Sequence, residues 1–186
     1  MSFRSDLWGV AVDQYGYVTS ANARDLGVPV VELGKLAARG RLERVSQGLY
    51  RFPEWPVSAN DSLMEAVLWT RDPRAALSHE TALEVYDLSD VNPDKIHVTI
   101  PKREKKIRRV GAAPAVVVHY QDLADDQIGW WEGIPTVAAG TAIDQCIASG
   151  ARPDLVSQAL VAARAEGRID EATAARLRLE LTGAVR

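Results

Sequence analysis

The chain has 186 residues, enough for one large domain or two small ones, and its hydrophobic content of 47% excludes an intrinsically disordered protein. Its formal net charge of -3 argues against a general binder of polyanions. Cys146 is the single cysteine, which excludes an intrachain disulfide. The first residues lack the apolar run of a signal peptide, and no stretch approaches the roughly 18 apolar residues of a membrane span. We therefore expect a cytoplasmic protein.

The first third of the chain predicts two short helices around a turn, followed by a β-hairpin. The expected elements are helices over about residues 3–14, 20–26 and 30–39 and a hairpin over 42–52. Thr19 or Ser20 can cap the second helix, and Gly27 can end it with a positive φ. Pro29 suits the start of the third helix, where its missing N–H costs nothing. This order predicts a winged helix-turn-helix over residues 1–56, with DNA as the first partner to consider.

Basic residues gather at the end of this stretch. From Lys35 to Arg51 the chain holds five basic residues and one acid, Glu43, so a local basic strip exists despite the negative total. If the third helix enters the major groove, its exposed N-terminal positions lie nearest the bases. The expected DNA contacts are Val31, Glu32 and Lys35 at bases, Arg39 and Arg41 at phosphates, and Arg44 and Arg51 on the hairpin. The alternative is a protein-docking module with solvated arginines.

The rest of the chain, residues 57–186, predicts a mixed α/β domain with a helical C-terminal end. Pro53 and Pro56 bracket the expected linker. The expected elements are helices over 61–70 and 79–86, strands over 95–100 and 115–120, two short strands around 130–137, and helices over about 141–149, 153–166 and 170–181. Trp130 and Trp131 are adjacent, so only one of them can point inward from a strand, and an exposed tryptophan is a candidate interface anchor.

A second basic segment lies between the two predicted strands, over Lys102–Arg109. Six of its eight residues are basic, and its position predicts a long, exposed hairpin loop. The basic residues are Lys102, Arg103, Lys105, Lys106, Arg108 and Arg109. They could contact DNA or RNA, or an acidic surface on a protein partner. The alternative is a solvated loop that protects the edge of the sheet from aggregation.

The histidines and acids offer no catalytic or metal-binding pattern. His79, His97 and His119 match no H-E-x-x-H or H-x-H spacing, and Cys146 has no partner cysteine. We expect His79 to be a helix-start residue that packs on the sheet. The acids between 87 and 94, with Lys95, contain the residue types of a metal nuclease, but their dense spacing in one turn argues against such a site. We therefore expect no catalytic residue, no metal and no cofactor.

Three runs of residues together resemble a known family. They are GVPVVELGKLAARGRLERVSQGLYRF, AALSHETALEVYDLSDVNPDKIHVTIPK and GIPTVAAGTAID. They are similar to AbiEi-family antitoxins, which regulate type IV toxin–antitoxin systems. The resemblance implies that the winged helix binds inverted repeats upstream of its operon and represses it. It also implies that the second domain counters a nucleotidyltransferase-like toxin, with which no stable complex is required.

These observations lead to one function and two alternatives. We expect a DNA-binding transcriptional autorepressor and antitoxin that is not an enzyme. Its partners would be operator DNA with inverted repeats and the toxin, not a membrane, and it would be a monomer in solution or self-associate weakly on DNA. The first alternative is a winged-helix regulator whose second domain binds a ligand or dimerises. The second is a nuclease or nucleotide-processing enzyme.

Overall fold

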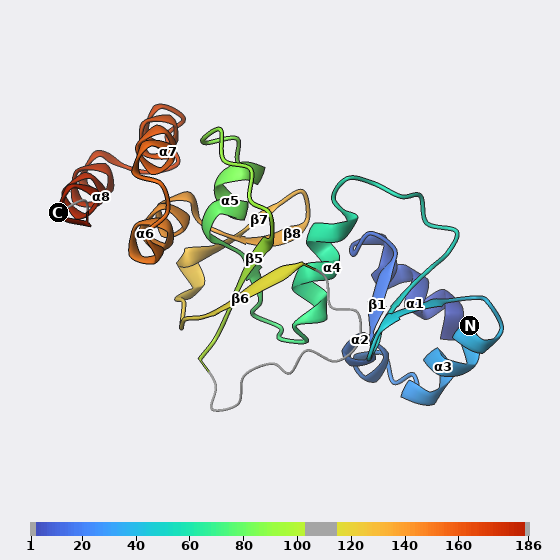
Figure 1. The fold of residues 1–186 in the computed structure, drawn as a ribbon. Coiled ribbons are helices and arrows are strands. Elements are labelled where there is room, and N and C mark those ends of the chain that lie inside the picture. Colours follow the sequence, from blue (N-terminus) through green and yellow to red (C-terminus); the bar gives the residue numbers. More distant parts are fainter. Residues whose placement is uncertain (1–2, 103–114, 185–186) are drawn as a thin grey trace. The chain divides into compact units, whose positions relative to one another are not determined.

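The computed structural model describes residues 3–102 and 115–184 (Figure 1). The chain divides into two compact units, with the break between Ala75 and Ala76. Each unit has its own sheet and its own buried core. The expected mixture of helices and strands is confirmed.

The first unit combines short helices with a three-stranded antiparallel sheet. Its elements are α1 (Phe3–Val12), β1 (Tyr17–Thr19), α2 (Ser20–Asp25), α3 (Val30–Ala38), β2 (Glu43–Ser46), β3 (Leu49–Arg51) and α4 (Asp61–Trp69). The strand order is β1-β3-β2, so β3 is central and pairs with both neighbours. The predicted hairpin is therefore present, and the short strand β1 lies at an edge of the sheet.

Local chemistry explains where α2 and α3 begin and end. The Thr19 hydroxyl accepts a hydrogen bond from the Asn22 N–H at 3.1 Å, and the Asn22 side chain accepts one from the Thr19 N–H at 2.8 Å. This reciprocal cap satisfies two free donors at the start of α2. Gly27 follows α2 with a φ of +68°, and Pro29 precedes α3. The helical segment is consistent with a helix-turn-helix.

A compact apolar core joins the helices of the first unit to its sheet. Its buried members are Leu7, Ala11, Val18, Ala23, Val28, Leu33, Leu42, Tyr50 and Phe52. Trp8 packs edge-on against Phe52, with ring centroids 4.9 Å apart. Because one member or more comes from each of α1, β1, α2, α3 and β3, the core fixes these elements to one another.

A buried ion pair attaches α4 to the sheet of the first unit. The Arg51 guanidinium on β3 donates to the Asp61 carboxylate at 2.7 Å and to the Pro56 carbonyl at 3.2 Å. The Tyr17 hydroxyl on β1 also donates to Glu65 on α4 at 3.1 Å. The sequence predicted a domain boundary at residue 56. The first compact unit extends to Ala75 and includes α4, and these polar contacts cross residue 56, whereas the boundary between functional domains stays a prediction.

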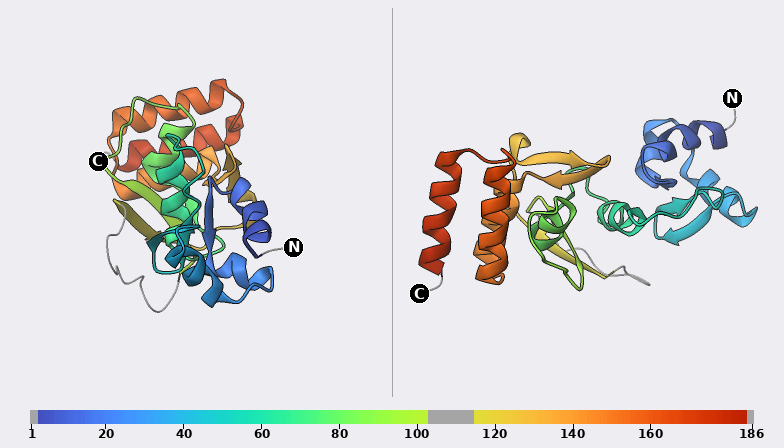
Figure 2. Two further views of the ribbon diagram at one scale, coloured as in Figure 1. Left: turned by 90° about the vertical axis from the view of Figure 1, so that its right-hand side faces the viewer. Right: turned by 90° about the horizontal axis from the view of Figure 1, so that it is seen from above.

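In the described residues, the second unit contains a five-stranded mixed sheet, four α-helices and one short 3-10 helix. Its elements are β4 (Ala76–Leu77), α5 (His79–Val85), β5 (Ile96–Ile100), β6 (Val116–Tyr120), the short 3-10 helix Asp125–Gln127, β7 (Ile128–Trp131), β8 (Ile134–Val137), α6 (Ala139–Ser149), α7 (Pro153–Ala165) and α8 (Glu171–Ala184). The strand order is β6-β5-β4-β8-β7. The helices α6, α7 and α8 pack against one another at one end of this unit (Figure 2).

The pairing of β5 with β6 corrects one prediction. The sequence predicted a hairpin loop over Lys102–Arg109, which requires antiparallel strands. The two strands are parallel, with Ile96 opposite Val116 and Ile100 opposite Tyr120. Parallel neighbours need a crossover connection, so the hairpin prediction is wrong.

Apolar side chains from α5 to α8 and from the sheet form the second core. Cys146 on α6 lies within it, fully buried, and burial together with the Glu80 carboxylate raises the pKa of its thiol to about 12. The thiol is therefore protonated and unreactive at neutral pH.

Trp131 packs against this core whereas Trp130 is 72% exposed, which confirms that one of the pair points inward. No helix in the described ranges combines the length and apolarity needed to cross a lipid bilayer.

Replacement of Asp61 by Ala tests the link between α4 and the first unit. The change leaves the Arg51 charge buried without its carboxylate, so we expect the free energy of unfolding to fall by about 3 kcal/mol. Glu180→Ala is the matched control, because it removes the exposed pair with Arg176 on α8 and should leave stability nearly unchanged. Urea denaturation of both variants measures the difference. Equal stability of Asp61→Ala and the wild type would contradict this role.

Candidate functional site

Helix α3 presents a mixed surface next to its buried anchor. Leu33 is fully buried in the core of the first unit, whereas Val31, two residues earlier, is 62% exposed. Lys35 is exposed and Glu32 is half-buried on the same side of the helix. The three predicted base-contacting side chains are therefore accessible on α3, with Val31 and Glu32 in its first turn and Lys35 in its last turn.

An ion pair already engages the one lysine of this helix. The Lys35 ammonium lies 2.7 Å from the Glu32 carboxylate, three residues earlier. The pair leaves this surface of α3 without net charge. An ammonium has three N–H donors, so Lys35 can keep its contact with Glu32 and still donate to a second acceptor.

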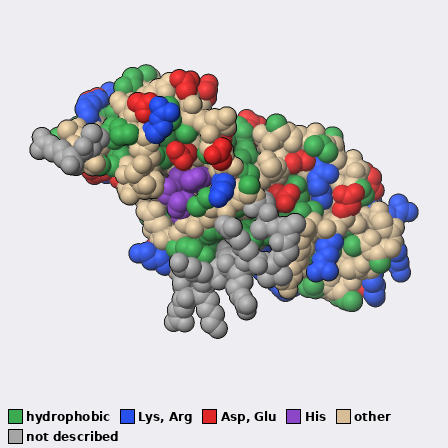
Figure 3. Space-filling view, in the orientation of Figure 1, with side chains coloured by type: hydrophobic (Ala, Val, Ile, Leu, Met, Phe, Trp, Pro, Cys, Tyr) green, Lys and Arg blue, Asp and Glu red, His purple; other side chains and the backbone are tan. Residues whose placement is uncertain are grey.

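Three further predicted residues lie exposed beyond α3. Arg39 follows the last turn of the helix, Arg41 follows Gly40, and Arg44 lies on β2 opposite Tyr50. Gly40 has a φ of +67°, a conformation that lets the chain turn from the helix into the hairpin. One short segment thus carries the exposed residues Arg39, Arg41 and Arg44, with Glu43 between the last two. On the face in Figure 3, basic and acidic side chains alternate over the surface.

Arg51 is a correction to the predicted set. The sequence assigned it to a hairpin contact with DNA, but its side chain is buried and paired with Asp61. Its guanidinium also lies over the Tyr17 ring, 5.6 Å from the centroid. A side chain held in this way has no surface to offer a phosphate, so Arg51 has a structural role.

The second predicted basic site is described only at its first residue. Lys102 is exposed, and its backbone N–H donates to the Asp122 carboxylate at 3.0 Å. The remaining predicted contacts, Arg103, Lys105, Lys106, Arg108 and Arg109, lie outside the described residues. Their contact with nucleic acid or with a protein partner stays a prediction.

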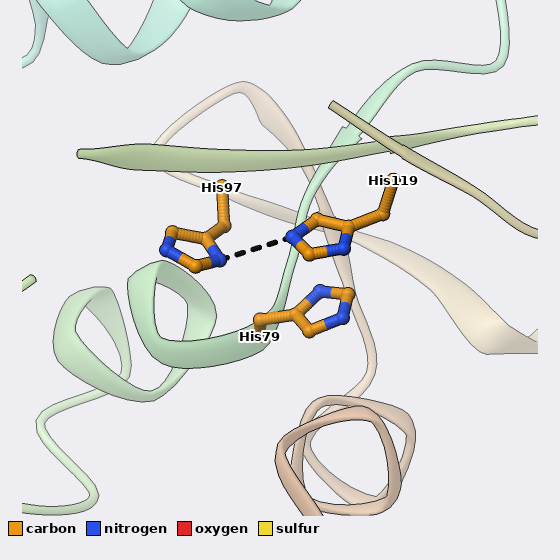
Figure 4. A group of neighbouring side chains, drawn as sticks. All are labelled: His79, His97 and His119. Carbon is orange, nitrogen blue, oxygen red and sulfur yellow. Dashed lines mark hydrogen bonds between the residues drawn. The ribbon is translucent and has the colours of Figure 1, made fainter. Parts of the chain in front are cut away.

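A histidine cluster is the feature that sequence reasoning missed. His79 begins α5, His97 lies on β5 and His119 lies on β6, yet their side chains meet at one place (Figure 4). His97 Nδ1 lies 3.1 Å from His119 Nε2, and the His79 ring stacks on His119 at a centroid distance of 3.5 Å. No local spacing encodes this arrangement, because it depends on the pairing of β5 with β6.

The three imidazoles are uncharged near neutral pH. Burial, followed by the nearby rings of His119 and His97, lowers the pKa of His79 to about 3. Burial and the His97 ring lower the pKa of His119 to about 4, and burial also lowers the pKa of His97. Each ring therefore keeps a free nitrogen lone pair.

Comparison with known proteins gives a family match for part of the first unit. Residues 10–53 match the family model described as "Transcriptional regulator, AbiEi antitoxin". No curated protein matches the chain. A solved structure with partial similarity is that of the RV2827C protein from Mycobacterium tuberculosis, at 15% identity and a TM-score of 0.46, covering 96% of this chain and 81% of that chain. The family match confirms the resemblance expected from the sequence over residues 10–53, which are similar to the AbiEi antitoxin and transcriptional regulator domain.

Proposed function

We propose that this protein is a DNA-binding transcriptional autorepressor and the antitoxin of a type IV toxin–antitoxin system. The observation that carries the proposal is the match of residues 10–53 to AbiEi transcriptional regulators. The matched range spans α2, α3 and the β2–β3 hairpin, the segment with the order of a winged helix-turn-helix. In the proposal, residues 1–56 form the DNA-binding winged helix and the rest of the chain carries the antitoxin function.

The proposed docking places α3 in the major groove of an operator half-site. Val31 would pack on a thymine methyl, Glu32 would accept from a cytosine amino group, and Lys35 would donate to guanine. Phosphates along the adjacent backbone would be contacted by Arg39, Arg41 and Arg44. Arg51 takes no part, because its side chain is buried. With few charges on α3, the phosphate contacts supply most of the affinity, and paired sites in an inverted repeat would add to it.

The antitoxin part of the proposal rests on the second unit. Its partner would be a nucleotidyltransferase-like toxin, and in a type IV system the two proteins act in opposition without a stable complex. Trp130 supports a contact surface on this unit, because a tryptophan exposed on the edge strand β7 is a suitable anchor for a protein partner. The same observation favours the second candidate function, a winged-helix regulator that dimerises through this unit.

Combined replacement of Lys35, Arg39 and Arg41 by Ala tests the DNA interface. We expect operator affinity to fall until the gel shift disappears, and the slope of log affinity against log salt to fall by about two, since Arg39 and Arg41 are proposed phosphate contacts and each lost phosphate contact removes about one. The matched control replaces Arg152, Arg164 and Arg168 in the second unit by Ala and has the same change of charge. Unchanged operator binding by the first variant, or equal losses in both, would contradict the assignment.

Replacement of Glu32 by Gln tests the ion pair on α3. The change frees Lys35 and removes a carboxylate from the DNA-facing surface. We expect affinity for random duplex DNA to rise by up to about fivefold, because an exposed pair is worth up to about 1 kcal/mol. We also expect discrimination between operator and random DNA to fall. Fluorescence anisotropy measures both, with Glu43→Gln on β2 as a control of equal charge. A Glu32→Gln variant no different from Glu43→Gln would argue against the role of Glu32.

The variant without Lys35, Arg39 and Arg41 also separates repression from antitoxicity. We expect it to lose repression of an operator–reporter fusion yet still relieve the growth arrest caused by a nucleotidyltransferase-like toxin encoded beside it. Wild-type protein provides the reference for both readouts. Failure of both proteins to relieve arrest would reject the antitoxin function and favour the plain regulator.

A further inference from the structure

The chain contains three histidines, and all three lie in one cluster of the second unit. They come from the start of α5, from β5 and from β6, so the tertiary fold alone assembles them. Figure 3 shows them as a patch at the surface, beside acidic side chains. Neither DNA binding by the first unit nor the family match accounts for this gathering.

Hydrogen bonds fix the backbone positions from which the rings project. The His79 N–H donates to the buried Gln145 side chain at 3.3 Å, and the Gln145 amide in turn donates to Thr99 and Gln121. The His97 N–H donates to the Thr81 hydroxyl at 2.9 Å. His79 also has a φ of +52°, an uncommon conformation for a residue with a side chain. The structure thus holds these residues in place at some cost in backbone strain.

The register of β5 and β6 places two of the rings side by side. His97 lies opposite Val117, and His119 is two residues further along β6, so both side chains project from the same face of the sheet. The 3.1 Å between their facing nitrogens is close to the separation of about 3.3 Å that two ligands at 2.0–2.1 Å from a tetrahedral zinc ion require. One nitrogen from each of the three rings lies within 4.8 Å of the others. Binding of one ion would need the His79 ring to turn out of its stack on His119.

Oxygens of neighbouring side chains lie near two of the ring nitrogens. The Glu80 carboxylate lies 3.8 Å from His97 Nε2, and the Ser78 hydroxyl lies 3.0 Å from His79 Nδ1. A proton on His97 Nε2 leaves the Nδ1 lone pair directed at His119. A carboxylate behind a metal-binding histidine orients the ring and raises its basicity in the same way.

We propose that His79, His97 and His119 form a binding site for one divalent transition-metal ion, with zinc the best match. Three imidazole nitrogens favour zinc, nickel, cobalt or copper over magnesium or calcium, which prefer oxygen ligands. Three protein ligands leave one position of a tetrahedral zinc ion for water or an anion. His97 and His119 are only half-buried, so the ion has a path from solvent.

A metal-free interpretation makes a different prediction. In it, His119 donates a hydrogen bond from Nε2 to His97 Nδ1, His79 stacks on the pair, and the cluster only stabilises the sheet. Zinc would then compete poorly with a hydrogen bond that is already formed. Direct metal binding therefore distinguishes the two.

The test is zinc titration of the full-length protein without a histidine tag, after removal of metals with a chelator. We expect calorimetry to give one zinc ion per chain and the midpoint of thermal unfolding to rise with zinc, because an ion that binds only the folded state stabilises it. Cobalt in place of zinc should give the visible absorption of a tetrahedral site. Magnesium is the control ion and should produce neither effect.

Variants identify the ligands. His97→Gln and His119→Gln should each lower zinc affinity by more than tenfold, and Glu80→Gln by about tenfold, as expected for a residue that positions a ligand. Glu166→Gln, which removes an exposed carboxylate of the same unit, is the control and should bind zinc as the wild type does. Circular dichroism confirms that each variant is folded. Absence of zinc binding by the wild type, or equal zinc affinity in the wild type and both histidine variants, would overturn the proposal.

Discussion

The buried pair between Arg51 and Asp61 determines how the first unit is built and which of its charges face solvent. It ties the central strand β3 to α4 at 2.7 Å and therefore extends the unit beyond its sheet. A buried arginine has to keep its carboxylate, because an unpaired charge in the interior is costly. As a consequence Arg51 is withdrawn from the surface, and the exposed cations left near α3 and β2 are Lys35, Arg39, Arg41 and Arg44.

Much of the fold could be predicted from local sequence signals. Capping at Thr19, the glycine and proline around α3, and the alternating apolar residues of β5 each act within a few residues, so their elements lie close to the expected ranges. What could not be predicted depends on contacts between distant segments. The two-residue strand β4 has no pattern of its own, and the parallel pairing of β5 with β6 leaves no trace in either strand.

The same distinction applies to the functional residues. Exposure of Lys35, Arg39 and Arg41 follows from helix periodicity and turn chemistry, which the sequence contains. Burial of Arg51 depends on a partner ten residues later in the chain, and the histidine cluster depends on three elements that only the sheet brings together. A motif search tests spacing along the chain, whereas a cluster from separate strands has no fixed spacing to test.

The N-terminal cap of α2 has a consequence for the rate at which the first unit can associate with a ligand. Thr19 ends β1 and caps α2, and the next residue, Ser20, donates its N–H to the carbonyl of Gly48 in the hairpin turn at 2.9 Å. A Cβ at Gly48 would also approach the Ser20 hydroxyl to 3.1 Å. The start of α2 and the hairpin turn are thus linked directly. A binding surface formed in advance in this way would associate at a rate set by diffusion and orientation rather than by an ordering step, and surface charge would then be the means to accelerate it.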